Sequence, residues 1–246
     1  SPIAIAKTDF PKKFGIPKQP LLVENLFAEL HFKKEFSRPE FFEGLEKGMA
    51  IWTIFLFHLH GNFSKPKVRP PALGGKKSHG VFSSRSPHRP NPIGLSLLIL
   101  EEVIFTPHKN TIMRVRGADF TDGTPILDIK PYLAKFDSLA ANNHTKEHWA
   151  NAPQRPHLQV LWSDSAQQSI IDLKMTEHKI LIADILKLDP RPPSQRNHLD
   201  KIFYLEFKNL QLSWIVIDEK ITISFHSSGK EHMRIRSLRN SWFCRF

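Results

Sequence analysis

The first half of the chain carries short stretches in which hydrophobic and polar residues alternate, or in which apolar residues run together. Alternation with a period of two is typical of strands with one buried face, and clusters of Pro, Gly and Asn separate the stretches as turns do. We predict strands at residues 3–7, 29–33, 51–58, 78–82, 95–103, 111–116 and 125–130. In this half, helical spacing is found only within residues 39–48.

Closely spaced strands with almost no helix between them favour an antiparallel β-barrel over a parallel α/β sheet. No Gly-x-Gly-x-x-Gly motif follows the first strand, so a doubly wound Rossmann domain is disfavoured. We therefore predict a mainly β chain whose N-terminal antiparallel barrel occupies residues 1–136.

The second half begins with a polar connection at residues 137–156, which we interpret as a linker. A smaller α+β domain is predicted at residues 157–226, and residues 227–246 form a basic tail. The predicted elements of this domain are strands at 157–162, 202–207, 210–218 and 220–225 and helices at 165–175 and 178–188.

The composition excludes several classes of protein. With 246 residues, 40% of them hydrophobic, the chain can bury a core. No segment approaches the ~20 apolar residues that span a bilayer, and the N-terminus lacks the pattern of a secretory signal. We therefore expect a cytoplasmic protein that does not enter a membrane. The only cysteine, Cys244, can form neither an intramolecular disulfide nor a Cys-based zinc site.

The positive charge is concentrated in one segment. The net charge is +11, and the 54 residues from Lys47 to Leu100 carry +8 of it without a single carboxylate. Such a distribution suits a polyanionic partner such as nucleic acid or an anionic membrane. Charge alone also fits a protein whose basic residues are scattered over its surface.

The most unusual segment is Arg85-Ser-Pro-His-Arg-Pro-Asn-Pro-Ile-Gly94. Its three prolines fix φ and push the preceding residues into extended geometry, so the loop should hold Arg85, His88, Arg89 and Asn91 in set directions. Rigid presentation of polar side chains suits ligand capture or catalysis, although a Pro-rich surface connection would look the same.

Two further groups of polar residues attract attention. Asp119, Asp122 and Asp128 lie within ten residues, but their spacing matches no metal-binding motif, so we predict no metal site. His58 and His60 follow an apolar strand, and His58 is the stronger candidate for a site residue. Gly-x-Ser-x-Gly and P-loop motifs are absent from the sequence, which disfavours the corresponding hydrolases and NTPases.

At these segments the sequence resembles the TrmO-type tRNA methyltransferases. Residues 80–96, Gly-Val-Phe-Ser-Ser-Arg-Ser-Pro-His-Arg-Pro-Asn-Pro-Ile-Gly-Leu-Ser, look like the signature of that family. Residues 122–132, Asp-Gly-Thr-Pro-Ile-Leu-Asp-Ile-Lys-Pro-Tyr, match its second block. Three shorter blocks follow the expected order, at residues 16–20, 68–75 and 189–192.

The resemblance implies a homodimeric barrel enzyme that methylates N6 of the threonylcarbamoyl-modified adenosine beside the tRNA anticodon, with S-adenosylmethionine as cofactor. The cofactor-binding residues that it implies are Lys18, Gln19, His58, Leu59, Arg85, Leu95, Arg116, Gly117, Ala118 and Asp119. The family often has Gln where this chain has Leu59, so either that polar contact is absent here or His60 replaces it.

Direct methyl transfer to the adenine nitrogen needs orientation and fixed dipoles rather than a covalent intermediate. We predict Asn91 as the first and Asp128 as the second catalytic residue. Arg85 and Arg89 would meet the donor carboxylate or an RNA phosphate, for which a guanidinium is suited. The predicted contacts to the anticodon stem-loop are Lys65, Lys67, Arg69, Lys76, Lys77 and Arg89.

Two alternatives remain open on the sequence alone. The first is a basic β-barrel module that binds RNA without catalysis. The second is a metal-dependent nuclease that uses Asp119, Asp122 and Asp128.

Overall fold

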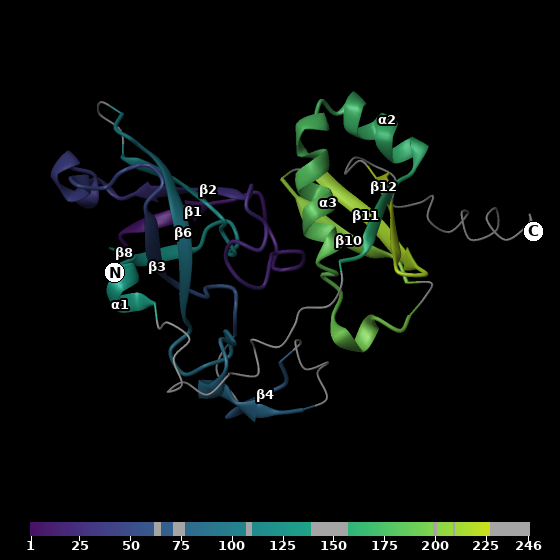
Figure 1. Cartoon of the computed structure of the whole chain (residues 1–246), viewed down its shortest axis with the longest axis horizontal. Coiled ribbons are helices and arrows are strands. Elements are labelled where there is room, and N and C mark those ends of the chain that lie inside the picture. The colour runs from purple at the N-terminus through teal and green to yellow at the C-terminus, as the bar shows by residue number, and fades with distance from the viewer. Residues whose placement is uncertain are drawn as a thin grey trace, which may run out of the picture.

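The computed structural model describes residues 1–61, 65–70, 77–106, 110–138, 157–198, 201–208 and 210–226. Six strands close into a barrel in the order β1-β2-β7-β6-β3-β8 (Figure 1). They are β1 (Ala4–Lys7), β2 (Phe27–Phe32), β3 (Ala50–Leu56), β6 (Ile93–Ile104), β7 (Ile112–Arg116) and β8 (Pro125–Pro131). Every neighbouring pair is antiparallel, which confirms the predicted barrel.

The alternation in the sequence places one face of each barrel strand inside. On β3, Ile51 and Phe55 are buried, whereas Trp52 and Ile54 lie on the outside. Opposite Phe55 stands Gly94 of β6, and a Cβ atom there would lie 2.3 Å from the Phe55 ring. The glycine that ends the Pro-rich segment is therefore needed to seat a large aromatic side chain in the barrel.

Three connections leave the barrel at the same end, because neighbouring strands run in opposite directions. Residues 8–26 join β1 to β2, residues 57–92 join β3 to β6, and residues 117–124 join β7 to β8. We call these connections the loop end of the barrel. The middle one contains a small ribbon made of β4 (Lys67–Val68) and β5 (His79–Gly80).

The C-terminal unit is a four-stranded sheet with two helices, as predicted, and lies beside the barrel in Figure 1. The sheet order is β10-β11-β12-β9, and β9 runs parallel to β12. Its elements are β9 (Gln159–Trp162), α2 (Asp164–Asp172), α3 (Lys179–Lys187), β10 (Phe203–Phe207), β11 (Leu210–Ile217) and β12 (Lys220–His226). Most of the predicted linker and the whole of the predicted basic tail lie outside the described residues.

The remaining helices of the described part are short, and no helix there is long and apolar enough to cross a membrane. They are α1 (Ala134–Asp137) and 3-10 helices at Lys34–Phe36, Pro39–Phe42, Val81–Ser83, Thr176–His178 and Pro193–Gln195.

At two places the structure differs from the local sequence pattern. The helical spacing noted within residues 39–48 yields only one 3-10 turn, because Gly44 and Gly48 adopt φ values of +82° and +90°. The strand predicted at residues 78–82 ends at Gly80 and is followed by the 3-10 helix Val81–Ser83, in which the Ser83 hydroxyl donates back to the Gly80 carbonyl at 2.9 Å.

Candidate functional site

Most of the predicted site residues belong to the loop end of the barrel. Lys18 and Gln19 come from the first connection, residues 58, 59, 85 and 91 from the second, and residues 117–119 from the third. Segments that are far apart in the sequence thus converge because the barrel closes. The predicted site residues on these connections therefore lie at one end of the barrel.

A half-buried carboxyl group of the third connection lies against β6. Asp119 Oδ1 accepts a hydrogen bond of 2.5 Å from the hydroxyl of Ser96, whose side chain points into the barrel. Burial raises the pKa of Asp119 to about 6, although the Ser96 hydrogen bond and the charge of Arg85 act in the opposite direction. Sequence reasoning missed Ser96, and its only signal was a hydroxyl at an inward position of an apolar strand.

Arg85 joins the first two connections. Its Nη1 donates a hydrogen bond of 2.8 Å to Gln19 Oε1. The Pro-rich loop around it is braced internally, because Arg89 Nη1 donates to the Ser84 carbonyl at 3.0 Å. Asn91 is exposed, and its backbone carbonyl accepts from the amide of Ile93 at 2.7 Å. The loop thus exposes Arg85 and Asn91, while the Arg89 guanidinium stabilises the loop through its hydrogen bond to the Ser84 carbonyl.

The first and third connections interlock at Gly117. This residue has φ +85°, and a Cβ atom on it would lie 2.2 Å from Cδ2 of Leu21. The Leu21 amide donates to the Gly117 carbonyl at 3.0 Å, and the Gly117 amide donates to the Leu26 carbonyl at 2.7 Å. Only glycine allows both the left-handed backbone and this close approach.

His58 sits in a polar group beside the same end. Its Nδ1 lies 3.5 Å from the hydroxyl of Thr124. Burial lowers the pKa of His58, and the nearby Asp122 carboxylate opposes that shift. Asp122 itself accepts from the Thr8 amide at 3.0 Å and lies 3.7 Å from the Lys7 ammonium. The neutral imidazole is therefore favoured at this position.

His60 packs against the Pro-rich loop. Its ring lies 5.1 Å from that of His88, measured between centroids, and its buried Nδ1 has no hydrogen-bond partner in the described structure. Burial lowers the pKa of His60 to about 4, and the charges of Lys13, His88 and His58 add to this effect. Between the two histidines, Leu59 exposes an apolar side chain, and its carbonyl accepts from the Lys13 ammonium at 2.8 Å.

Three predicted residues lie on the outer surface of the barrel strands instead. The Arg116 Nε bonds to Glu101 at 2.7 Å, and this bond lowers the pKa of Glu101. Asp128 forms an ion pair of 3.0 Å with Lys130, as expected for two residues on one face of a strand. Leu95 is half exposed.

The three aspartates that could have formed a metal site do not converge. Asp119 bonds to Ser96, Asp122 to the Thr8 amide, and Asp128 pairs with Lys130. No group of three or more His, Cys, Asp or Glu side chains in the described part of the chain could hold a metal ion.

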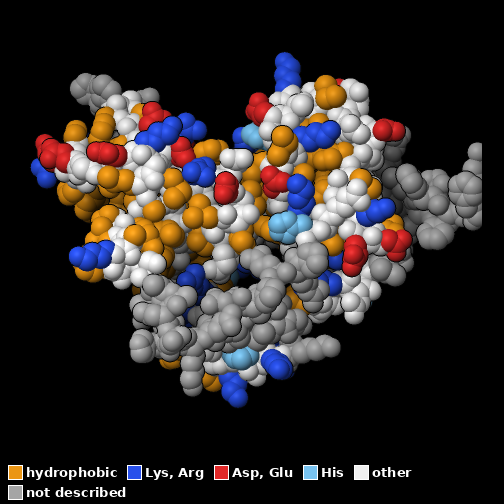
Figure 2. All heavy atoms as spheres, viewed as in Figure 1, with side chains coloured by type: hydrophobic (Ala, Val, Ile, Leu, Met, Phe, Trp, Pro, Cys, Tyr) orange, Lys and Arg blue, Asp and Glu red, His pale blue; other side chains and the backbone are white. Residues whose placement is uncertain are grey.

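Several of the basic residues predicted to contact RNA lie within or next to the β4-β5 ribbon in the sequence. Those described there, Lys65, Lys67, Arg69 and Lys77, are all exposed, whereas Lys76 lies outside the described residues. Blue side chains are visible at the lower end of Figure 2, where Figure 1 places β4. Beside the ribbon, Phe82 is 79% exposed, the highest value among the exposed large hydrophobic side chains of the described residues. Sequence reasoning missed Phe82.

The side chains at the loop end suit a small zwitterionic ligand that also has an apolar part. Arg85 can meet a carboxylate, Asp119 can meet an ammonium group, and Leu59 offers an exposed apolar surface. These are the groups that S-adenosylmethionine carries.

Comparison with known proteins decides the family. Residues 5–138 match the family model of the tRNA-methyltransferase O N-terminal domain, and residues 155–225 match that of the TrmO C-terminal domain.

The chain belongs to the TrmO family.

Relatives of known name share most of their length with this TrmO-family chain. The Escherichia coli "tRNA (adenine(37)-N6)-methyltransferase" is 32% identical over 88% of this chain and 92% of its own. The Pseudomonas aeruginosa "Putative S-adenosylmethionine-dependent methyltransferase RcsF" is 37% identical over 87% of this chain and 90% of its own. A crystal structure of TrmO from P. aeruginosa superposes with a TM-score of 0.70, at 31% identity, over 92% of this chain and 94% of that one. The resemblance predicted from the sequence blocks is confirmed.

The raised pKa of Asp119 should make the free energy of unfolding depend on pH. Because its pKa in the fold is about 6, against 3.8 ordinarily, the native protein holds a proton between pH 4 and 6 that the unfolded chain releases. Its contribution to stability therefore falls as the pH rises through this range. Asp119→Asn does not titrate, so the free energy of unfolding of the variant should rise relative to that of the wild type by roughly 2 to 3 kcal/mol from pH 4 to pH 7.

Urea unfolding at pH 4, 5, 6 and 7 measures this difference. Subtracting the free energy of unfolding of the wild type from that of the variant cancels the contribution from the titration of His60. Asp218→Asn, which changes an exposed carboxylate in a turn, is the control and should give a difference that stays flat with pH. A flat difference for Asp119→Asn would show that burial does not perturb this group.

Proposed function

We propose that the chain transfers a methyl group from S-adenosylmethionine to N6 of the threonylcarbamoyl-modified adenosine beside the anticodon of tRNA. The observation that carries the proposal is the near full-length similarity to the E. coli tRNA (adenine(37)-N6)-methyltransferase. The loop end supports it, because its three connections bring together the side chains that such a cofactor needs. A tRNA substrate would place the protein in the cytoplasm, with other tRNA-modifying enzymes.

The proposed donor site uses the loop end. When bound, S-adenosylmethionine supplies an electrophilic methyl group, whose transfer breaks a C–S bond as a C–N bond forms. Arg85, oriented by Gln19, would bind the carboxylate of the donor, and Asp119 would bind its ammonium group. Leu59 and the neutral His58 would border the rest of the molecule, together with Lys18, Leu95 and the 116–119 turn.

Asn91 would orient the acceptor. The exocyclic amine of adenine is a weak nucleophile because its lone pair is delocalised, so the site must hold it in line with the methyl group. The exposed Asn91 carboxamide, fixed between Pro90 and Pro92, can accept a hydrogen bond from the N6–H group, whose proton passes to solvent as the C–N bond forms. Asp128 is the second candidate, and its ion pair with Lys130 would have to open for it to do the same.

The β4-β5 ribbon would hold the anticodon stem-loop. The exposed cations Lys65, Lys67, Arg69 and Lys77 suit RNA phosphates, and the segment that carries them contains no carboxylate. We assign Lys76 and Arg89 to the same track. The exposed ring of Phe82 lies three residues before Arg85 and offers a surface on which an unpaired base can stack.

A second copy of the chain would cover the outer face of β3 and β6. On this face apolar residues pair across the strands, as Trp52 with Leu97, Ile54 with Leu95 and Leu56 with Ile93. Leu95 and Ile93 are 50% and 45% exposed, and hydrophobic side chains form continuous areas over the barrel in Figure 2. A continuous apolar stripe of this kind marks an interface, and a twofold axis would let it pair with itself. The proposed homodimer would also close the donor site at Leu95.

The methyl transfer is tested directly with purified protein, labelled S-adenosylmethionine and tRNA that carries the threonylcarbamoyl group without the methyl group. Nucleoside analysis should find the label on that modified adenosine. RNA binding without transfer would favour the non-catalytic module, and label on another base would contradict the assigned substrate.

Asn91→Ala should lower kcat by roughly 100-fold, as the loss of a positioned hydrogen-bonding group does. The Kd for tRNA should change by less than about threefold, because phosphate contacts supply most of the binding energy. Asn110→Ala, at an exposed asparagine of the opposite end of the barrel, is the matched control and should match the wild type in both. Equal losses of turnover and affinity in the Asn91 variant would argue against a catalytic role.

Leu97→Glu should convert a dimer into a monomer, because it places a charge in the middle of the apolar stripe. Sedimentation equilibrium measures the mass, and Ile171→Glu, which alters an exposed apolar residue of α2, should leave the dimer intact. A wild-type protein that sediments as a monomer, or a Leu97 variant that stays dimeric, would exclude this interface.

A further inference from the structure

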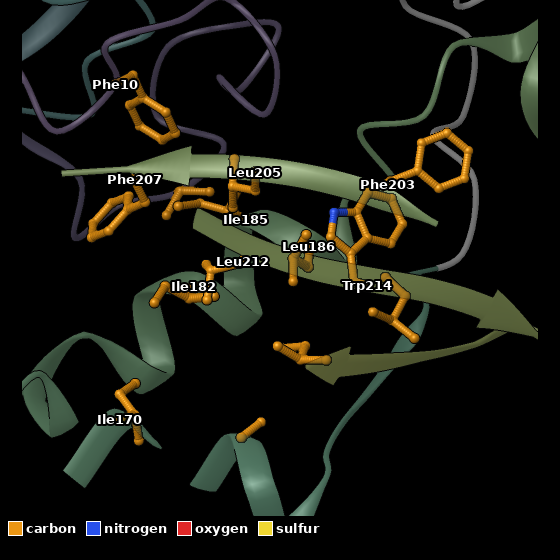
Figure 3. Packing of buried hydrophobic residues seen from close by; sticks show 14 of the residues in the cluster. Phe10, Ile170, Ile182, Ile185, Leu186, Phe203, Leu205, Phe207, Leu212 and Trp214 are labelled. Atoms are coloured by element: carbon orange, nitrogen blue, oxygen red, sulfur yellow. The ribbon is translucent and has the colours of Figure 1, made fainter. Parts of the chain in front are cut away.

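The first connection of the loop end, residues 8–26, packs its apolar side chains against the C-terminal domain rather than inside the barrel. Phe10, Val23 and Leu26 are buried in one hydrophobic cluster with residues of the C-terminal sheet and helices. In Figure 3, Phe10 lies over β10, near Phe207 and Leu205. The ring centroids of Phe10 and Phe207 are 5.7 Å apart, with the rings nearly perpendicular.

The same connection runs alongside β10 in the opposite direction. The amide of Lys208 donates to the carbonyl of Asp9 at 2.6 Å, and the Lys12 ammonium forms an ion pair with Glu206. Further along, the ring of Phe14 stacks on that of Phe203. β10 is the outermost strand of the C-terminal sheet, and the connection covers the edge of β10 that faces away from β11.

The approach is closest at Gly15. This residue has φ +93°, and a Cβ atom on it would lie 2.0 Å from Cδ1 of Leu205. Lys18 and Gln19 follow only three and four residues later, and Gln19 bonds to Arg85. So short a length of chain ties the position of Gln19 to the contacts made by residues 9–16.

We propose that the C-terminal domain positions the donor-binding connection. Phe10 and Phe207 are positioning residues in this scheme: they touch no donor atom, but they fix the segment that carries Lys18 and Gln19 and, through Gln19, orient Arg85. A connection released from β10 must be ordered again each time the donor binds, which lowers affinity. This inference rests on the proposed function, because it concerns affinity for S-adenosylmethionine.

The test measures the Kd for S-adenosylmethionine by calorimetry with the full-length chain. Phe207→Ala and Phe10→Ala should each raise it about tenfold. Ile170→Ala is the matched control, because Ile170 is buried in the same cluster but lies on α2, on the helical side of the sheet in Figure 3. It should change the Kd by less than twofold.

A second readout follows the connection itself. Trypsin should cleave after the exposed Lys18 faster in the Phe207 variant than in the Ile170 variant. Thermal unfolding identifies any variant that fails to fold.

A charge swap keeps the test informative if the buried substitutions prevent folding. Glu206→Lys should raise the Kd two- to threefold by repelling Lys12, without removing buried apolar surface. The double variant Lys12→Glu, Glu206→Lys should restore the wild-type value, which a merely structural effect of either substitution would not do.

The outcomes separate this inference from the proposed function. A wild-type chain that binds no S-adenosylmethionine contradicts the function itself. A wild-type chain that binds it, with folded Phe10 and Phe207 variants that bind equally well, overturns the positioning role alone. An Ile170 variant that loses as much affinity as the Phe207 variant overturns it too, because the effect would then belong to the core in general.

Discussion

Closure of the barrel is the constraint on which the rest of the structure depends. A six-stranded antiparallel barrel in the order β1-β2-β7-β6-β3-β8 sends three of its connections to one end, whatever their sequences. Those connections carry Gln19, Arg85 and Asp119, and the hydrogen bonds of Arg85 to Gln19 and of Ser96 to Asp119 form only because this end brings them together. Loop residues gain fixed positions here because rigid strands hold both ends of each loop.

The same strands serve two surfaces at once. Along β6, Gly94, Ser96, Leu98 and Leu100 point inward and are buried, while the alternate residues are also apolar and point outward. An interior needs only one apolar face. The second apolar face thus has no explanation within the isolated barrel, which is why we assign it to a partner chain rather than to stability.

The alternation of residues was enough to predict most strands and the barrel, because period two is a local property. It failed where local structure departs from the pattern, as at the 3-10 helix Val81–Ser83, which follows a short strand, and at Gly44, whose positive φ interrupts the helical spacing. It also could not show what a side chain meets across the fold. The sequence did not show, for example, that the Arg116 guanidinium pairs with Glu101 on the outer face of the barrel, where β6 and β7 lie side by side. The cofactor contacts of all the predicted residues stay predictions.

The placement of the acidic side chains fits the proposed contacts of the β4-β5 ribbon with RNA. The segment from Lys47 to Leu100 contains no carboxylate, while Asp9, Glu24, Asp119 and Asp122 lie on the first and third connections. Several of the acidic side chains have a partner: Lys208 lies 3.8 Å from Asp9, the Ser96 hydroxyl donates to Asp119, and Lys7 lies 3.7 Å from Asp122. A phosphate approaching the β4-β5 ribbon therefore meets exposed lysines and arginines, with little opposing negative charge. Because the pKa of Asp119 is about 6, most of its carboxyl groups are ionised at neutral pH, so this side chain can serve the proposed contact to the ammonium group of the donor while the exposed cations of the ribbon face the RNA.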